Sequence, residues 1–205
     1  MKKNINDLFE GYLKFKQNVD HSKLLDLHLH GQKPKALVIS CCDSRVDPAL
    51  LFQCGPGDLF IVRNIANIVP PYKKELLHHG ISSALEFGIK ALKINNIIIL
   101  GHSQCGGVKA WMENQKSKDN RDNSLEFVNN WISTIDVQNY EEGSVDDCAK
   151  LSLINSYKNC LTFPWIKDKV DSKELGIHLL FFDIETCRLL AYDHDDGEYK
   201  DVERE

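Results

Sequence analysis

The stretch LFIVRNIANIVPPYKKELLHHGISSALEFGIKALKINNIIIL, residues 59–100, carries the clearest signal for the fold. It begins with an apolar run at residues 59–62 and ends with another at residues 97–100, and such runs are typical of strands buried on both faces. Between them, apolar residues recur at helical spacing from Ile81 to Leu92, which predicts a helix that joins two parallel strands. The stretch therefore predicts a β-α-β unit.

The rest of the chain extends this unit in both directions. An apolar run at residues 36–39 predicts a strand before it, and residues 177–182 and 188–192 predict a closing pair of strands after it. Helical spacing recurs over residues 125–135 and, more weakly, over residues 145–152. We expect an α/β fold with a mainly parallel central β-sheet, flanking helices and an antiparallel edge strand.

The N-terminal region has a different pattern. Residues 6–15 carry an apolar stripe that predicts an amphipathic helix, packed either on the protein's own core or on a partner subunit. We interpret residues 1–31 as an N-terminal helical arm and residues 32–205 as the α/β core of a single domain. Polar residues 114–123 predict an exposed loop or a frayed helix end, and the acidic tail, residues 193–205, is expected to lie in solvent. The stripe consists of Leu8, Phe9, Tyr12 and Leu13.

Charge and composition exclude several classes of function. The 205 residues include 25 Lys and Arg and 30 Asp and Glu, and no basic cluster stands clear of acids, so we expect no nucleic-acid partner. No apolar run reaches the roughly 18 residues of a membrane span, and residues 1–7 lack the apolar part of a secretory signal, so we expect a cytoplasmic protein without membrane association. Seven cysteines, an odd number, indicate reduced thiols or metal ligands rather than a disulfide framework.

Candidate metal ligands follow two of the predicted strands. The strand at residues 36–39 runs toward Cys41, and the strand at residues 97–100 runs toward His102 and Cys105. Ligands of open α/β sheets bind beyond the carboxyl ends of the strands, so these side chains are expected to meet. Two thiolates and one imidazole suit a catalytic Zn²⁺ with an open fourth position. Taken singly, each of the three residues also fits a packing role.

The residues around Cys41 add a second element. Asp43 can accept a hydrogen bond from water at the metal, and Arg45 can pair with Asp43, keep it ionised and hold it off the metal. A plain surface ion pair is the alternative. Cys42 is adjacent to Cys41, and chemistry alone leaves either thiol able to bind the ion.

These patterns resemble those of the β-class carbonic anhydrases. The family signature is C-x-D-S-R, here residues 41–45, followed after one β-α-β crossover by H-x-x-C, here residues 102–105. The similarity covers nearly all of residues 32–110, and its spacing resembles the plant-type branch. It implies one Zn²⁺ per subunit held by Cys41, His102 and Cys105, with Cys42 turned away, and reversible hydration of carbon dioxide by a zinc-bound hydroxide. Asp43 and Arg45 are implied as the catalytic pair.

The resemblance also implies a substrate site. It assigns an apolar pocket for carbon dioxide to Phe60, Ile65 and Phe87, and hydrogen-bond donation to the Gln32 side-chain amide and the Gly106 backbone N–H. Several of these residues come from the neighbouring subunit in the family, which implies a homodimer or a dimer-based higher oligomer. Taken alone, the three apolar residues would be assigned to the core. Phe87 departs from the plant-type branch, which often has Tyr there.

Other features limit the assignment. Val38 stands where the other main branch has a Trp of a second bicarbonate site, so we expect no strong inhibition by bicarbonate of that kind. His78 and His79 have the right chemistry for proton transfer but also fit the start of a helix, and neither is assigned as a shuttle.

Three alternative functions stay open from the sequence. The first is hydrolysis of carbon disulfide or carbonyl sulfide on the same scaffold, and the second is a non-catalytic zinc site. Thiol redox chemistry is disfavoured because Cys41 and Cys42 are adjacent rather than in a C-x-x-C pattern.

Overall fold

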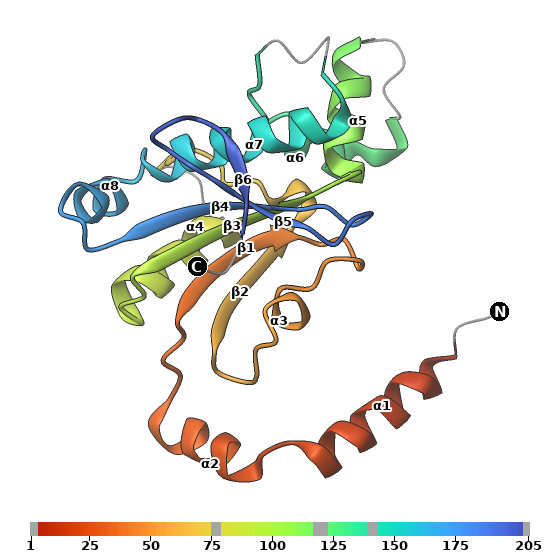
Figure 1. The fold of residues 1–205 in the computed structure, drawn as a ribbon, viewed down its shortest axis with the longest axis vertical. Coiled ribbons are helices and arrows are strands. Elements are labelled where there is room, and N and C mark those ends of the chain that lie inside the picture. Colours follow the sequence, from red (N-terminus) through yellow and green to blue (C-terminus); the bar gives the residue numbers. More distant parts are fainter. Residues whose placement is uncertain (1–3, 75–78, 117–122, 139–142, 203–205) are drawn as a thin grey trace. The chain divides into compact units, whose positions relative to one another are not determined.

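The computed structural model describes residues 4–74, 79–116, 123–138 and 143–202. The chain groups into two compact units, Met1–Gln32 and Lys33–Glu205. The first unit contains helices, and the second contains the sheet with its own helices (Figure 1).

The N-terminal unit consists of α1 (Ile5–Asn18) and α2 (His21–His30). Helix α1 confirms the predicted amphipathic helix, and Oδ1 of Asn4 caps it by accepting the Asn6 backbone N–H at 3.2 Å. No residue of either helix is buried. The four side chains of the apolar stripe are between 54% and 68% exposed. The stripe is thus an unburied apolar surface in the single chain.

Within the described residues, six strands form one sheet in the order β2-β1-β3-β4-β5-β6 (Figure 1). The first four strands are parallel to one another, and β5 and β6 are antiparallel additions. This arrangement confirms the predicted α/β fold with a mainly parallel sheet and an antiparallel edge. The strands are β1 (Ala36–Cys41), β2 (Leu59–Asn64), β3 (Asn96–His102), β4 (Gly176–Phe182), β5 (Leu189–Tyr192) and β6 (Tyr199–Asp201).

Strand β2 differs from its prediction. The sequence predicts burial on both faces, but β2 is largely half-buried, and Ile61 is 37% exposed. The reason is position, because β2 is an edge strand and, among the described strands, has a neighbour on one side only. Strand β1 lies between β2 and β3 and is buried along its whole length, as predicted.

The helices of the second unit are unequally divided between the two faces of the sheet. They are α3 (Pro48–Leu51), α4 (Gly80–Glu86), α5 (Gly106–Lys116), α6 (Glu126–Ile132), α7 (Val145–Cys160) and α8 (Pro164–Asp171), with the short turns η1 (Ile65–Asn67), η2 (Phe87–Ala91) and η4 (Asn123–Leu125). Helices α4, α5, α7 and α8 pack with Leu37 and Ile39 in the main core. A smaller cluster, built on Val38, Val46 and Leu100, lies on the other face beside α3.

The predicted helices are present, with different lengths. Helix α4, continued by the π-helical turn η2, confirms the crossover helix. Helix α7 is longer than its weak pattern indicates, and a capping box between Ser144 and Asp147 stabilises its start. Helix α5 extends into the predicted loop as far as Lys116, and residues 117–122 lie outside the described residues. None of the helices in the described part of the chain combines the length and apolar character that crossing a bilayer requires.

The acidic tail contains a strand that the sequence analysis did not predict. Strand β6 pairs with β5, with Tyr199 opposite Tyr192, and the Tyr199 ring also contacts the ring of Phe181 at a centroid distance of 6.4 Å. The expectation of solvent exposure holds for Lys200 and Asp201, which are exposed, whereas Tyr199 is half-buried. A short polar strand is stable there because it pairs with the backbone of β5 and anchors one aromatic ring.

The register of the parallel strands brings two strand ends together. Ser40 of β1 pairs with Leu100 of β3, so Cys41 and His102, which end these strands, lie at the same edge of the sheet. After β1 the chain continues toward α3 on one face, whereas after β3 it continues into α5 on the other. Neighbouring connections that diverge in this way form a topological switch point, where open α/β sheets bind ligands.

Candidate metal centre

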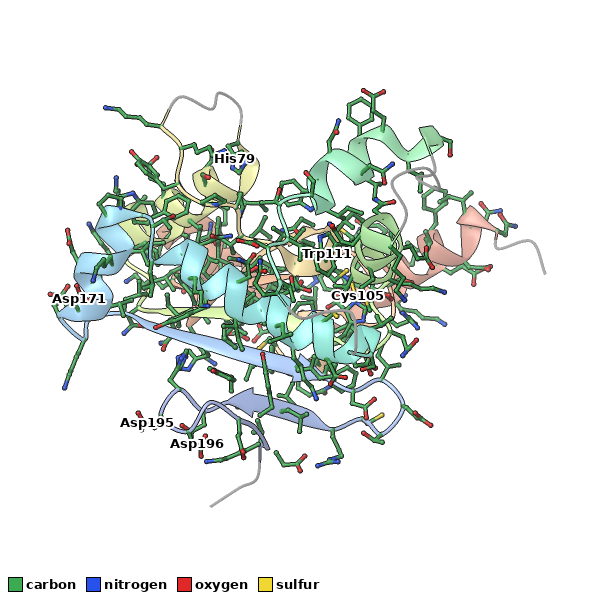
Figure 2. The ribbon with its side chains drawn as sticks, turned by 90° about the horizontal axis from the view of Figure 1, so that it is seen from above. His79, Cys105, Trp111, Asp171, Asp195 and Asp196 are labelled. Atoms are coloured by element: carbon green, nitrogen blue, oxygen red, sulfur yellow. The ribbon has the colours of Figure 1, made fainter. Side chains whose placement is uncertain are left out.

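Three donor side chains meet at the switch point. One ligand atom each from Cys41, His102 and Cys105 lies within 4.8 Å of the other two, and all three residues are buried. The sulfur atoms of Cys41 and Cys105 are 3.9 Å apart. Figure 2 labels Cys105 close to α5, whose buried Trp111 is labelled above it. The structure thus brings the three predicted ligands together.

One ring nitrogen of His102 makes a hydrogen bond, and the other is available to bind a metal ion. Its Nδ1–H donates to the backbone carbonyl of Ser103 at 2.9 Å, which leaves the lone pair on Nε2. Nε2 is buried and has no hydrogen-bond partner among the described residues. A buried polar atom without a partner is unfavourable, and a metal ion at the two sulfurs would satisfy it.

The two thiols are electrostatically coupled. The hydrogen bond between the two thiol groups lowers the pKa of Cys41, and the same interaction, with burial, raises the pKa of Cys105. Thiolates rather than thiols bind metals, so an ion would replace the shared proton. Two sulfurs and one imidazole nitrogen fit Zn²⁺ with a fourth tetrahedral position open.

Asp43 lies beside these donors but is held by Arg45. Its Oδ1 accepts the backbone N–H of Arg45 at 3.0 Å and Nε–H at 2.9 Å, and its Oδ2 accepts Nη2–H at 2.7 Å. Hydrogen bonding to the Arg45 guanidinium holds the pKa of the Asp43 carboxyl well below its usual range. Asp43 is therefore an ionised acceptor whose two oxygens are both bonded to Arg45.

Arg63 braces the loop that carries Cys41 and Asp43, a role that the sequence analysis missed. It sits near the end of β2, one residue before the partner of Cys41 in the sheet register. Its guanidinium donates four hydrogen bonds of 2.8 to 2.9 Å, to the carbonyl oxygens of Cys41, Asp43 and Val46 and to the carboxylate of Asp47. The available signal was a charged residue directly after the apolar run at residues 59–62.

The turn after β2 packs tightly against the start of α5. Ala66 has a left-handed φ of 62°, and the Asn64 side chain closes the turn through hydrogen bonds with the Ile68 N–H and carbonyl at 2.8 and 3.0 Å. A Cβ atom added at Gly107 would lie only 2.6 Å from Cγ2 of Ile65. Glycine at this position permits the close approach of α5 to the turn.

The predicted substrate residues lie on several elements. The rings of Phe60 in β2 and Phe87 in η2 contact each other at a centroid distance of 5.9 Å. Ile65 lines a separate cavity of about 380 Å³, which neither ring lines. Gly106 begins α5, where an added Cβ would meet nothing within 4 Å, and Gln32 is an exposed residue at the end of the other unit. Their roles in substrate binding stay predictions.

Cys42 does not join the donor group. It is exposed and lines the cavity of Ile65, together with His79 and Trp131, in agreement with the orientation expected from strand alternation. His79 precedes α4, where its Nδ1 lies 2.8 Å from the Ser82 hydroxyl. His78, the other histidine considered for proton transfer, lies outside the described residues.

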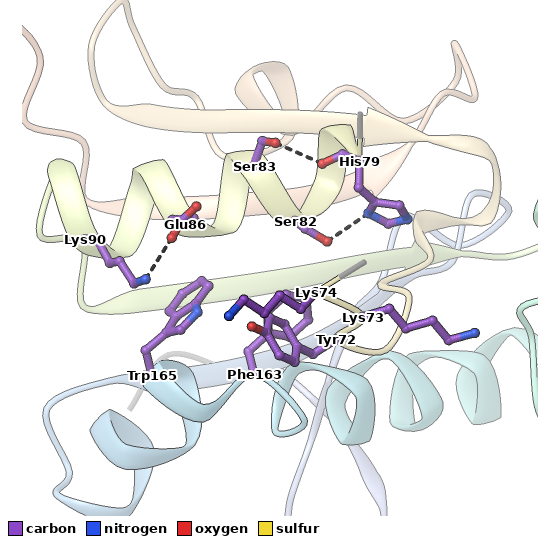
Figure 3. A pocket seen from close by; sticks show the side chains of 10 residues that line it. All are labelled: Tyr72, Lys73, Lys74, His79, Ser82, Ser83, Glu86, Lys90, Phe163 and Trp165. Atoms are coloured by element: carbon purple, nitrogen blue, oxygen red, sulfur yellow. Dashed lines mark hydrogen bonds and ion pairs between the residues drawn. The ribbon is translucent and has the colours of Figure 1, made fainter. Parts of the chain in front are cut away.

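The cavity drawn in Figure 3 lies away from the donor group. It has a volume of about 430 Å³, and none of the three donors lines it. Several polar groups on its wall already bond to one another, including Glu86 with Lys90 at 2.7 Å. Its other side is aromatic and includes Phe163 and Trp165. Its chemistry gives no reason to place the functional site there.

Sequence comparison identifies relatives of one kind. The chain matches the family described as "Carbonic anhydrase" over residues 36–189. It is 36% identical over 185 residues to "Beta carbonic anhydrase 5, chloroplastic" from Arabidopsis thaliana, in an alignment covering 85% of this chain and 58% of that protein. The chain thus spans less than two thirds of that relative's length.

Comparison with solved structures gives the same family. The β-carbonic anhydrase CcaA is similar with a TM-score of 0.86 and 31% identity, over 98% of this chain and 92% of that chain. One of two tetrameric β-carbonic anhydrases from Sordaria macrospora is similar with a TM-score of 0.67 and 27% identity, over 97% and 93% of the two chains.

Proposed function

The chain belongs to the β-class carbonic anhydrases, and from this we propose that it catalyses the reversible hydration of carbon dioxide to bicarbonate and a proton, using one Zn²⁺ per subunit. One observation supports the proposal above others. A buried Cys-His-Cys donor group lies beside a carboxylate, that of Asp43, which Arg45 restrains. A purely structural zinc site has no need of such a restrained carboxylate.

Cys41, His102 and Cys105 would hold the ion, through two sulfurs and Nε2. When bound, Zn²⁺ acidifies water and so supplies a nucleophile near neutral pH. Two negatively charged thiolates reduce the positive charge of the site, so a group that orients the attacking water becomes more important.

Asp43 is the group proposed to orient that water. Its carboxylate is ionised and can accept a hydrogen bond. Its Oδ2 lies 3.8 Å from Nε2 of His102. Arg45 bonds to both carboxylate oxygens, which opposes movement of Asp43 toward the three donors. This restraint would leave an open position for water once Cys41, His102 and Cys105 hold the ion.

We further propose that the substrate is received by Phe60, Ile65 and Phe87 as apolar contacts and by the Gly106 N–H and the Gln32 amide as donors. Gly106 begins α5 directly after the donor Cys105, which supports its part. Phe87 is 50% exposed and Ile65 is 36% exposed, which leaves apolar surface for a second subunit or a substrate to cover.

A homodimer or a dimer-based higher oligomer is proposed on two grounds. The stripe of α1 is apolar and unburied in the single chain, and the similar enzymes from Sordaria macrospora are described as tetrameric. Light scattering on the purified protein would check this, and a stable monomer would contradict it. The cytoplasmic location also stays a proposal, to be checked by cell fractionation.

The experiment that tests the function is stopped-flow hydration of carbon dioxide with bound zinc quantified, at mildly acidic and mildly alkaline pH. The wild-type protein should be fast, with a rate that rises with pH, and Cys41→Ser should lose rate and zinc together. A protein with stoichiometric zinc and no hydration at either pH would contradict the proposal and favour an analogue hydrolase or a structural site.

A further inference from the structure

Gln104 forms the tip of the loop between two of the metal donors. It is the exposed residue in the otherwise buried segment from His102 to Cys105. Its φ is 53°, in the left-handed region that residues other than glycine rarely adopt. A contact from outside the loop is therefore needed to hold this peptide in place.

Asp146, in the first turn of α7, makes that contact. Its Oδ1 accepts the backbone N–H of Gln104 at 2.7 Å and the side-chain amide of the same residue at 3.4 Å. Hydrogen bonds to a carboxylate are stronger than bonds between neutral groups, so this contact can stabilise the unfavourable φ. On the opposite side of Gln104, its carbonyl accepts Nη2–H of Arg45 at 3.2 Å.

These contacts form a continuous chain from α7 to the candidate catalytic carboxylate. It runs from Asp146 to Gln104 at 2.7 Å, from Gln104 to Arg45 at 3.2 Å and from Arg45 to Asp43 at 2.7 Å. We propose that Asp146 is a positioning residue, which fixes the loop between the metal donors and, through the Gln104 carbonyl, the orientation of Arg45. The inference rests on the proposed function, because it gives these contacts a part in zinc-dependent chemistry.

Removal of the Asp146 carboxylate should act on the metal and on the reaction. Without its acceptor, the Gln104 peptide can leave the left-handed region, so His102 and Cys105 are held less firmly and Arg45 loses a partner. Groups that support metal ligands typically change metal affinity or activity by about 10–100-fold when they are lost. We expect zinc release from Asp146→Ala to be faster, and kcat to be lower, by a factor in this range.

The neighbouring aspartate provides a matched control. Asp147 lies in the same turn of α7, but its carboxylate accepts the N–H and the hydroxyl of Ser144 in the capping box, at 3.0 and 2.6 Å. Asp147→Ala therefore removes a carboxylate and weakens the start of the same helix without removing the bond to Gln104. Asp146→Asn is the conservative variant, because it keeps an oxygen acceptor and loses only the charge.

The experiment follows transfer of zinc from the zinc-loaded protein to a chromophoric chelator, together with kcat, KM and thermal unfolding, for wild type and the three variants. The expected order of release rates is wild type, Asp146→Asn and then Asp146→Ala, while Asp147→Ala lowers the unfolding temperature and releases zinc within about twofold of wild type. KM should change little in Asp146→Ala while kcat falls.

Equal zinc release from Asp146→Ala and Asp147→Ala would overturn the proposal, because the effect would then come from the helix start alone. Zinc release from Asp146→Ala at the wild-type rate would also overturn it, because the carboxylate would then have no part in holding the loop. A wild-type zinc protein that fails to hydrate carbon dioxide would contradict the proposed function instead, and the comparison of zinc release would still decide the role of Asp146.

Discussion

Oδ2 of Asp43 lies 3.8 Å from Nε2 of His102, close enough for the carboxylate to compete for the metal if it were free to turn. The same oxygen accepts a hydrogen bond from Arg45 at 2.7 Å. The closeness of Asp43 to the donors and its hydrogen bonds to Arg45 act together, because a nearby carboxylate assists the reaction only while it does not bind the metal. Arg45 is therefore expected to determine which of the two outcomes occurs.

Replacing Arg45 by Gln should lower kcat/KM for carbon dioxide hydration by about 10–100-fold, as expected for loss of a group that orients a metal site. Gln removes the charge and the paired donors, so Asp43 can approach the ion. Arg45→Lys should be intermediate, because an ammonium keeps the charge but cannot donate from two parallel N–H groups. Stopped-flow assays on zinc-quantified protein would measure this, and wild-type rates in Arg45→Gln would contradict the role of the restraint.

Adjacent cysteines provide a test of the donor assignment. Cys41→Ser should bind much less zinc than wild type, because Cys41 is buried within the donor group, whereas Cys42→Ser should keep one zinc per chain because Cys42 is exposed outside it. Elemental analysis after gel filtration would measure the zinc content. If both variants lost zinc equally, the assignment of Cys41 over Cys42 would be wrong.

Arg63→Met should reduce the free energy of unfolding by about 3 kcal/mol, since it leaves several carbonyl groups near β1 without a donor. The matched control is Arg188→Met, in which an exposed arginine loses its pairing with Asp201 and the expected change is below about 1 kcal/mol. Urea unfolding of both zinc-loaded variants would check the difference. Similar losses of unfolding free energy from the two substitutions would show that the hydrogen bonds of Arg63 do not stabilise the loop more than an exposed ion pair does.

Two neighbouring glycines should respond differently to alanine. At Gly107 the new Cβ would approach Ile65 Cγ2 at 2.6 Å and Ala66 Cβ at 3.1 Å, so Gly107→Ala should cost about 1–3 kcal/mol of stability. At Gly106 the Cβ meets nothing within 4 Å, so Gly106→Ala should change stability by no more than about 0.5 kcal/mol. Chemical denaturation of both variants would measure this, and equal effects would argue against tight packing at Gly107.

Cys160 should contribute to the pH dependence of stability. Burial raises the pKa of its thiol from 9.0 to about 12. Above pH 9.0 the thiol ionises in the unfolded chain but not in the folded one, so this contribution is complete below that pH and is lost as the pH rises toward 12. Unfolding free energies across this interval should fall less steeply in Cys160→Ala than in wild type. Parallel slopes for Cys160→Ala and the wild type would contradict the prediction.

The sequence predicts the parallel part of the fold well, because buried parallel strands have a strong pattern. Residues 36–39 and 97–100 are apolar without interruption, and the polar residues that follow them mark the edge at which Cys41 and His102 meet. Strand β6 has no such pattern, since its stability comes from backbone pairing and a single ring, that of Tyr199. The partial exposure of β2 could not be predicted either. It depends on the position of the strand in the sheet, and a local sequence pattern does not determine strand order.

The supporting residues of the site were less predictable than its donors. Donor types and their spacing are visible in a sequence, whereas Asp146 acts on Gln104 across 42 positions of chain. An aspartate in the first turn of a helix is also favourable near the positive end of the helix dipole, so the type of residue alone does not indicate a contact elsewhere. Arg63 was more accessible to sequence reasoning, as a charge that directly follows the apolar run at residues 59–62 and still lies in β2.

The meeting of Cys41 and Cys105 has a consequence for the unfolded chain. The two residues are 64 positions apart, so an ion that binds both closes a large loop in the manner of a covalent cross-link. For a loop of this length, the chain-entropy estimate for a cross-link is about 4 kcal/mol at 25 °C. To the extent that both bonds persist in the unfolded chain, zinc would restrict the number of conformations available to it. A chelator that takes the ion away would then remove this restriction and also empty the metal site. The reaction and the folding equilibrium would therefore both depend on the same ion.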